Sequence, residues 1–436
     1  MKEREKTTHS WNLVRYVVAF FVALLIITVF LMTSSLIPPE SIQANMEESA
    51  QYIENKEQVE YLITGVLGTQ LHYSADATWL SISYGFNSEH PFESTMWANY
   101  YSGSGGLCKS FADQVQNQYD GNTQYLRYWH GAAAVVRFLH LGLNAHQIYI
   151  LHAAMMVLLF TLLVWMLWKN GVISEVLSLG FALLMVSAWV VPFCLEYVWI
   201  FLIMFAISII AGRMALQGRY DRAGILFLLT GMVTIFLDFL TTETLTLLIP
   251  LLFMLRISSR QQYEPKRMWQ LAVKASVAWL AGYCGMWVMK WVIASLVLRQ
   301  NVMPFVQEHI EERLGGSVGL SLPEFLSQAI IRNVQRLAFY DYGIYGTVAF
   351  FVFLIVLLTP VFAGRVSLRE KINWSRIGLY AVLMMIPYIR YLVLHNHSYG
   401  HFCFTYRAQA ASILALCFII LELVQFNTRK AVMKNA

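Results

Sequence analysis

The densest group of residues that could do chemistry lies between Arg390 and Arg407. This short segment combines two arginines with hydrogen-bonding side chains: Arg390, His395, His397, Tyr399, His401, Thr405, Tyr406 and Arg407. A guanidinium group binds phosphate through two parallel hydrogen bonds, and histidine and tyrosine supply further donors. This composition predicts an anion site in which Arg390, Arg407, His397 and His401 contact a phosphate and Tyr406 lines the cavity.

Two other interpretations of this segment stay open. The spacing of His395, His397 and His401 could offer three imidazoles to a metal ion. However, no acidic residue lies within the segment, and the sequence has no HExxH motif. The segment could also be a polar loop without a ligand. We expect no cofactor and no bound metal, and we keep a divalent metal as the alternative.

Asp76 is the candidate catalytic base. It lies in the stretch Tyr73 to Trp79, where apolar and aromatic neighbours would partly desolvate a carboxylate and raise its pKa. The alternative is an ordinary aspartate that caps a helix or closes a turn. Glu47 and Glu48 form a rival acidic pair, although their acidic surroundings are typical of a solvated helix face.

A second acidic motif, Asp238-Phe-Leu-Thr-Thr-Glu243, joins two apolar runs. Carboxylates so close to hydrocarbon must face a polar cavity or a partner. The sequence therefore predicts that Asp238 and Glu243 line the substrate cavity, unless Asp238 only caps the next helix.

Other candidate residues could hold a sugar or a lipid headgroup. The adjacent residues Arg127, Tyr128, Trp129 and His130 combine aromatic rings with cationic and polar groups, which suits a headgroup, a sugar ring or a plain aromatic belt. Lys290 lies in an apolar run with no charged residue within a helical turn. It is a further candidate for the phosphate, although we expect its side chain to snorkel towards the headgroups.

The composition shows what must position these residues. The chain has 436 residues, of which 58% are hydrophobic and 13% charged, whereas soluble domains carry about 25% charged residues. Apolar runs long enough to cross a bilayer predict an all-α integral membrane protein with ten spans, at 16–36, 147–168, 172–190, 194–212, 223–237, 242–256, 270–298, 343–363, 376–394 and 408–426.

The positions of the basic residues orient these spans. With a cytoplasmic N-terminus, 19 of the 31 basic residues fall in the short inside segments, which include residues 1–15 and the tail 427–436. This distribution also argues against nucleic acid as a partner. The long segments 37–146 and 299–342 lie outside, together with ten of the eleven histidines. We therefore expect a multi-pass protein of a bacterial plasma membrane with its active face outside.

The outside segments contain three predicted helices. Residues 40–63 and 125–143 combine helical apolar spacing with polar residues, and a capping-box pattern begins a helix at Ser321. We expect all three helices to lie in the headgroup layer.

This architecture resembles the GT-C fold of glycosyltransferases that use polyprenyl-phosphate sugars. The resemblance rests on a retained first helix, a large first outside loop with interfacial helices, and many further spans with reactive residues outside. It implies that Asp76 is the base and that Arg390, Arg407 and Lys290 clamp the donor phosphate. The GT-C fold usually carries an acidic pair soon after its first span. In this sequence Asp76 stands alone and comes about forty residues after that span.

The resemblance implies transfer of a sugar from a lipid-linked donor to an acceptor glycan, lipid or protein on the extracytoplasmic face. The partners would be the bilayer, the donor and this acceptor. Two other classes stay open. One is a transporter or flippase of a lipid-linked or anionic substrate. The other is an extracytoplasmic acyl- or phosphoryltransferase that uses the histidines.

Overall fold

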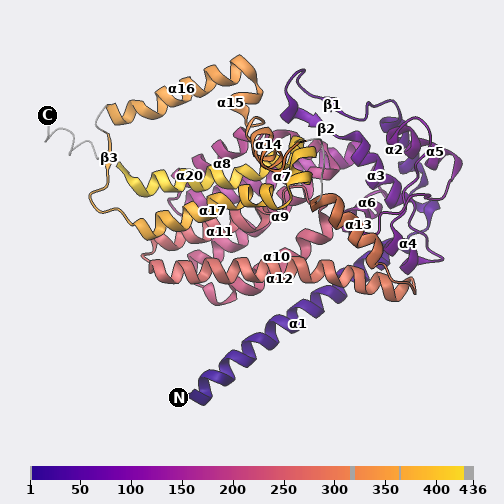
Figure 1. The fold of residues 1–436 in the computed structure, drawn as a ribbon, viewed down its shortest axis with the longest axis horizontal. Helices are drawn as coiled ribbons and strands as arrows, with labels where there is room; N and C mark the ends of the chain where they lie inside the picture. The colour runs from indigo at the N-terminus through magenta and orange to yellow at the C-terminus, as the bar shows by residue number, and fades with distance from the viewer. Residues whose placement is uncertain (1, 315–319, 363–364, 427–436) are drawn as a thin grey trace.

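The protein is almost wholly helical, as predicted. The computed structural model describes residues 2–314, 320–362 and 365–426. Their helices run largely in one direction, with a folded segment gathered at one end (Figure 1). The predicted cytoplasmic tail 427–436 lies outside the described residues.

A helix coincides with each predicted span: α1 (Lys2–Ser35), α7 (Ala145–Lys169), α8 (Ile173–Met185), α9 (Leu195–Leu216), α10 (Ala223–Leu237), α11 (Leu245–Arg260), α12 (Pro265–Val297), α16 (Gly343–Phe362), α17 (Trp374–Val393) and α20 (Gln409–Leu423). Within the described residues, seven helical stretches are long and apolar enough to cross a membrane. Helix α8 is shorter, as is Gly343–Val356, the continuous part of α16 whose side chains are described. The chain is thus a multi-pass membrane protein, and the number ten stays a prediction.

Helix α11 forms the centre of the bundle. Every residue from Leu245 to Ser259 is buried, because α9, α10, α12 and α20 all contact this helix. Protein rather than lipid surrounds α11, so it can carry Arg256. The Nε of Arg256 lies 2.7 Å from Oε1 of Glu175 on α8, and its Nη1 pairs with Glu422 on α20.

Two glycines bring α10 and α12 into backbone contact. A Cβ on Gly231 would overlap the carbonyl oxygen of Trp279, and a Cβ on Gly282 would overlap that of Leu228. Small residues allow membrane helices to approach in this way. Helix α12 has 33 residues and is about 50 Å long at 1.5 Å per residue. It therefore extends past the roughly 30 Å hydrocarbon layer.

The first loop, residues 36–144, folds into a compact segment at one end of the bundle (Figure 1). It contains α2 (Gln43–Glu54), α3 (Tyr73–Tyr84), α4 (Pro91–Trp97), α5 (Leu107–Asn117), α6 (Gly131–Leu139) and the antiparallel pair β1 (Glu60–Tyr61) and β2 (Gln70–Leu71). The start of α1 and a second antiparallel pair, β3 (Val366–Leu368) with β4 (Val424–Phe426), lie at the opposite end.

Helices form within the predicted ranges 40–63 and 125–143, but their apolar faces pack inside the protein. Their position in the headgroup layer stays a prediction. The apolar face of α2, including Ile42, Met46 and Ile53, is fully buried inside the protein. Helix α6 starts only at Gly131 and is largely buried as well. Arg137 on α6 donates hydrogen bonds to backbone carbonyls of α3 and of the segment after α1. The apolar faces of these helices supply the core of the first loop.

The second outside segment contains the short helices α13 (Met303–Leu314), α14 (Leu322–Val334) and α15 (Ala338–Asp341). Helix α14 begins with the predicted capping box, in which the backbone N–H of Ser321 donates to Oε2 of Glu324 at 3.0 Å. Leu322 and Ile331 are exposed on α14. Its position in the headgroup layer stays a prediction.

Candidate functional site

The start of α9 receives Asp76 from the first loop. Asp76 lies in the first turn of α3 and is 1% exposed. Its Oδ1 accepts hydrogen bonds from the backbone N–H of Leu195 at 2.9 Å and from Sγ of Cys194 at 3.3 Å. Its Oδ2 accepts one from the Tyr149 hydroxyl at 2.6 Å. The carboxylate therefore caps α9, which is the structural role that the sequence left open.

The same environment gives Asp76 the pKa of a base. Burial raises the pKa of Asp76 to about 7, and the hydrogen bonds from Tyr149, Leu195 and Cys194 limit the rise. A general base works best when its pKa lies near the working pH. Capping and proton transfer are compatible if a substrate hydroxyl replaces the Tyr149 hydroxyl.

Arg407 lies on the other side of the α9 start. Its guanidinium stacks on the Tyr197 ring with its central carbon 4.4 Å from the ring centre, and Nη2 donates to the carbonyl of Gly68 at 3.0 Å. Its Nη1 lies 3.4 Å from the carbonyl of Cys403. Arg407 is 1% exposed, its Nε has no hydrogen-bond partner, and no carboxylate among the described residues pairs with it. Within the described part of the chain it is thus a buried cation without a counter-ion.

His72 and Glu196 form an ion pair that the sequence analysis did not single out. Nδ1 of His72 lies 3.5 Å from Oε2 of Glu196, and both side chains are only partly buried. Burial alone would lower the pKa of His72, but hydrogen bonds to Cys403 and Glu196 raise it to about 10. In the sequence, only Glu196 indicates this pair, because an acid near the start of an apolar span requires a partner.

Arg390, the other predicted phosphate ligand, already has a carboxylate partner. Its Nε lies 2.9 Å from Oε1 of Glu243, and its Nη2 lies 3.3 Å from Oε2, so the pair is bidentate. Nη2 also donates to the carbonyl of Leu240 at 2.6 Å, and Nη1 donates to the Ser398 hydroxyl. The predicted cavity residue Glu243 therefore neutralises Arg390. A phosphate at Arg390 would have to compete with this pair.

A row of rings connects the surroundings of Arg390 and Arg407. The row runs through α18 (His395–Gly400) and α19 (Phe402–Thr405). The ring centres of His397 and His401 are 4.7 Å apart, and those of His401 and Phe404 are 5.2 Å apart. Phe404 in turn contacts His72 at 6.0 Å. Nδ1 of His397 lies 3.4 Å from Nη2 of Arg390, and Phe404 contacts Tyr197, on which Arg407 stacks. The row therefore runs from one arginine to the other.

His395 lies away from this row, because its ring packs against Phe325 of α14 at 5.0 Å. The three imidazoles of the HxHxxxH spacing therefore do not converge. Among the residues that the structure describes, no three His, Cys, Asp or Glu side chains are arranged to hold a metal ion.

The predicted cavity residues from the first loop pack against the turn between α10 and α11. Phe239 of this turn stacks on Tyr128 at 4.7 Å and on Trp79 at 3.9 Å, and it contacts the ring of His130 at 4.9 Å. Burial, together with the charges of Lys290 and Arg127, lowers the pKa of His130 well below its usual value. Neutral His130 and the aromatic rings therefore form one cluster where the first loop meets the turn between α10 and α11.

Asp238 precedes Phe239 in the same turn. It accepts hydrogen bonds from the backbone N–H and the hydroxyl of Thr241. Burial and the neighbouring Glu243 raise its pKa to about 7. Asp238 thus stabilises its own turn instead of capping α11, and the turn brings Phe239 to the cluster.

The remaining predicted residues connect the first loop to α12. The indole of Trp129 donates to the carbonyl of Met286 at 2.8 Å. Nζ of Lys290 donates to the carbonyls of Thr95 and Met96 at 3.2 and 3.1 Å. The expectation that Lys290 snorkels is wrong, because its side chain is fully buried. Its ammonium group satisfies the last carbonyls of α4.

Tyr406 and the acidic pair Glu47 and Glu48 have simple surroundings. The Tyr406 hydroxyl donates to the carbonyls of Val186 at 2.9 Å and Gly68 at 3.2 Å, so Tyr406 holds the wall beside Arg407. Glu47 accepts from Gln43, and Glu48 accepts from Asn144, both at exposed positions. The rival acidic pair therefore lies on a solvated helix face, as expected.

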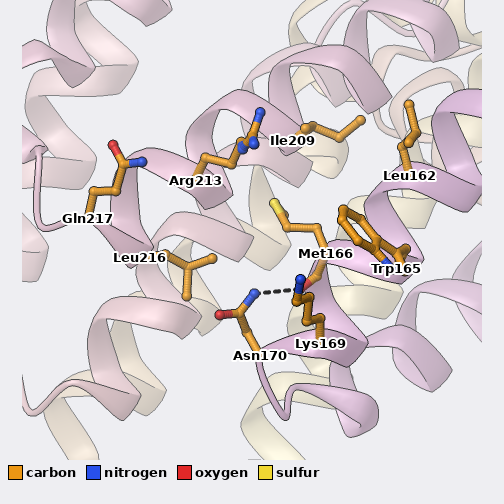
Figure 2. Close-up of a pocket in the computed structure, with 9 residues that line it drawn as sticks. All are labelled: Leu162, Trp165, Met166, Lys169, Asn170, Ile209, Arg213, Leu216 and Gln217. Atoms are coloured by element: carbon orange, nitrogen blue, oxygen red, sulfur yellow. Dashed lines mark hydrogen bonds between the residues drawn. The ribbon is translucent and has the colours of Figure 1, made fainter.

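Three cavities of the described chain lie elsewhere. Figure 2 shows one of about 430 Å³ between α7 and α9, with Leu162, Trp165, Met166 and Ile209 towards one side and the polar Asn170 near Lys169. The other two lie between α1, α10 and α12. The predicted site residues line none of these three.

We compared the chain with protein-family models, curated proteins and solved structures, and none of them matches it.

Proposed function

We propose that this chain is a membrane glycosyltransferase of GT-C type. It would transfer a sugar from a polyprenyl-phosphate donor to an acceptor on the side of the first loop, outside the cytoplasm. The observation that supports this proposal most strongly is Arg407, a buried guanidinium with no carboxylate partner among the residues that the structure describes.

The energetics of Arg407 favour an anionic ligand. A buried charge is costly unless a counter-charge or several hydrogen bonds compensate for its lost hydration. Two carbonyls and the face of Tyr197 supply only part of this compensation. A phosphate beside the free Nε would supply a full negative charge with matching geometry. His397 and His401 line the way from Arg407 to Arg390 and could contact the same ligand.

The proposed reaction uses the two sides of the α9 start. The acceptor hydroxyl gives its proton to the Asp76 carboxylate, and its oxygen forms a bond to the anomeric carbon of the sugar. The bond between that carbon and the phosphate oxygen breaks, and the bonding electrons leave with the polyprenyl phosphate. Arg407 stabilises the charge that develops on this phosphate.

Polyprenyl phosphate, the product that all such donors share, tests the proposal without knowledge of the sugar. Arg407→Lys keeps the charge but loses the two parallel hydrogen bonds. We expect this variant to bind polyprenyl phosphate about tenfold or more weakly, since one hydrogen bond to a charged group is worth about 1.5–3 kcal/mol. Binding is measured on purified protein by native mass spectrometry, and turnover by donor consumption.

The matched control is Arg260→Lys. Arg260 lies at the other end of the bundle and pairs with Glu175 at 3.2 Å, so this variant should bind like the parent. Equal binding by Arg407→Lys and the parent would contradict the phosphate assignment. If Arg407→Lys binds like the parent while Asp76→Asn loses all turnover, Asp76 remains the proposed base and the proposed phosphate site moves to Arg390.

A further inference from the structure

A polar cavity opens between α1, α10 and α12, far from the first loop. It has a volume of about 490 Å³, and its charged lining residues are Arg15, Asp221, Arg222 and Lys274. Among the described lining residues, three cations and one acid give a net positive charge. Arg15 lies twenty residues before the end of α1, which is about 30 Å along a helix. The cavity is therefore at the opposite end of the bundle from Arg407.

An apolar cavity of about 700 Å³ adjoins the polar one. Its walls include Leu13 of α1, Leu228 of α10 and Val273, Val277 and Trp269 of α12. Tyr16 and Lys274 line both cavities, so the two share a wall. Figure 1 shows that α1 diverges from α10 and α12 towards its start. The apolar cavity and the cavity with cationic residues therefore lie side by side.

A glycine keeps this junction open. A Cβ on Gly224 would overlap the Tyr16 hydroxyl and would lie 2.8 Å from Cε of Lys274. Nζ of Lys274 donates to the backbone carbonyl of Asp221 at 3.2 Å. The carboxylate of Asp221 forms no ion pair with Arg15, Arg222 or Lys274 among the described contacts. The cationic groups therefore retain capacity for an anion.

We propose that this pair of cavities binds a phosphate-bearing membrane lipid from the leaflet opposite the first loop. The phosphate contacts Lys274, Arg15 and Arg222, and one tail lies in the apolar cavity between α1 and α12. Basic residues near a membrane surface attract anionic headgroups in general. The shared wall at Tyr16 and Lys274 distinguishes this site, because it places headgroup and tail contacts at the spacing of one molecule.

The test measures retention of phosphatidylglycerol by the purified full chain with native mass spectrometry, and it needs no turnover assay. Lys274→Gln should reduce retention about tenfold, since a charge-assisted hydrogen bond is lost and 1.4 kcal/mol is a factor of ten. Gly224→Ala should also reduce it, because the added methyl group pushes Tyr16 and Lys274 into the junction. Phosphatidylcholine should be retained less than phosphatidylglycerol by the parent.

Lys266→Gln is the matched control. Lys266 is exposed on the first turn of the same helix and lines neither cavity, so it removes the same charge without touching the site. An equal loss in Lys266→Gln would overturn the proposal in favour of general surface charge. Displacement of the lipid by millimolar glycerol phosphate would overturn it in favour of a simple anion site. Retention unchanged in both Lys274→Gln and Gly224→Ala would overturn it as well.

Discussion

Arg407 and Lys290 are both buried cations, yet their surroundings give them different roles. Lys290 finds two carbonyl acceptors at the end of α4, where a positive charge also meets the negative end of the helix. It therefore holds the first loop on α12. Arg407 has an Nε without a partner and carbonyls on only part of its fork. Of the two, Arg407 is the better candidate for a ligand contact.

Asp76 should make the stability of the protein depend on pH. Its pKa rises from an ordinary value of 3.8 to about 7 on folding. The stabilisation is fully present below about pH 4 and is lost as the pH rises to about 7, because the buried group must then ionise. One pKa unit corresponds to about 1.4 kcal/mol. Asp76→Asn lacks this dependence, so it should gain stability relative to the parent between pH 4 and 7.

Thermal unfolding of the parent and of Asp76→Asn across this pH range checks the prediction. Asp238 has a similar pKa of about 7, but it is present in both proteins and cancels in the difference. A difference in unfolding temperature that stays constant from pH 4 to 7 would contradict it.

Residue types revealed part of this site. Asp76, Arg407, His397 and His401 were candidates because charged and polar groups in an apolar chain require a partner. The structure brings Asp76 and Arg407 to the same helix start, although 331 positions separate them in the sequence. The partners of Arg390 and His72 could not be read in this way. Glu243 becomes a neighbour of Arg390, and Glu196 a neighbour of His72, only when the chain has folded.

At the scale of elements, the close contact between α10 and α12 can be tested directly. Gly282→Ala places a Cβ against the backbone carbonyl of Leu228, which no side-chain rotation can relieve. We expect a loss of about 1–3 kcal/mol, the usual cost of overpacking. The measurement is the unfolding temperature of the purified protein in detergent.

Gly180→Ala is the control for this prediction. Gly180 lies inside α8, and an added Cβ would meet nothing within 4 Å. It should stabilise the helix slightly, by up to about 1 kcal/mol. If Gly282→Ala is as stable as Gly180→Ala, the two helices do not pack as described.

Spans could be predicted from the sequence more reliably than loops. An apolar run of about 20 residues has one favourable solution in lipid, so its helix is fixed by composition. An amphipathic helix has two, because its apolar face can contact either lipid or protein. Ile42 and Met46 on α2 pack against protein. This packing depends on the core of the whole folded loop, which a local sequence pattern does not predict.

For the whole molecule, the side of the membrane can be tested with cysteines at exposed positions. Cys108 is unsuitable although it lies in the first loop, because it is buried and burial raises its pKa to about 11. Ser104→Cys in the first loop and Lys371→Cys at the opposite end are both exposed. In intact cells, a membrane-impermeant thiol reagent should label Ser104→Cys and should label Lys371→Cys only after permeabilisation.

The native chain already has an exposed cysteine, Cys284 on α12, which could react with the reagent. Labelling is therefore scored in a Cys284→Ser background. Equal labelling of both cysteines in intact cells, or labelling of Lys371→Cys alone, would contradict the predicted orientation.

The central position of α11 has a consequence for biogenesis. Insertion machinery releases segments into lipid in chain order, so α11 meets hydrocarbon before the bundle has closed around it. Arg256 can then pair only with Glu175, because α8 is made before α11 and α20, which carries Glu422, is made last. Ribosome-bound chains truncated before α20 should therefore retain α11 in the membrane only while Glu175 is intact. Glu175 on α8 would therefore keep α11 in the membrane until Glu422 on α20 is synthesised and pairs with Arg256.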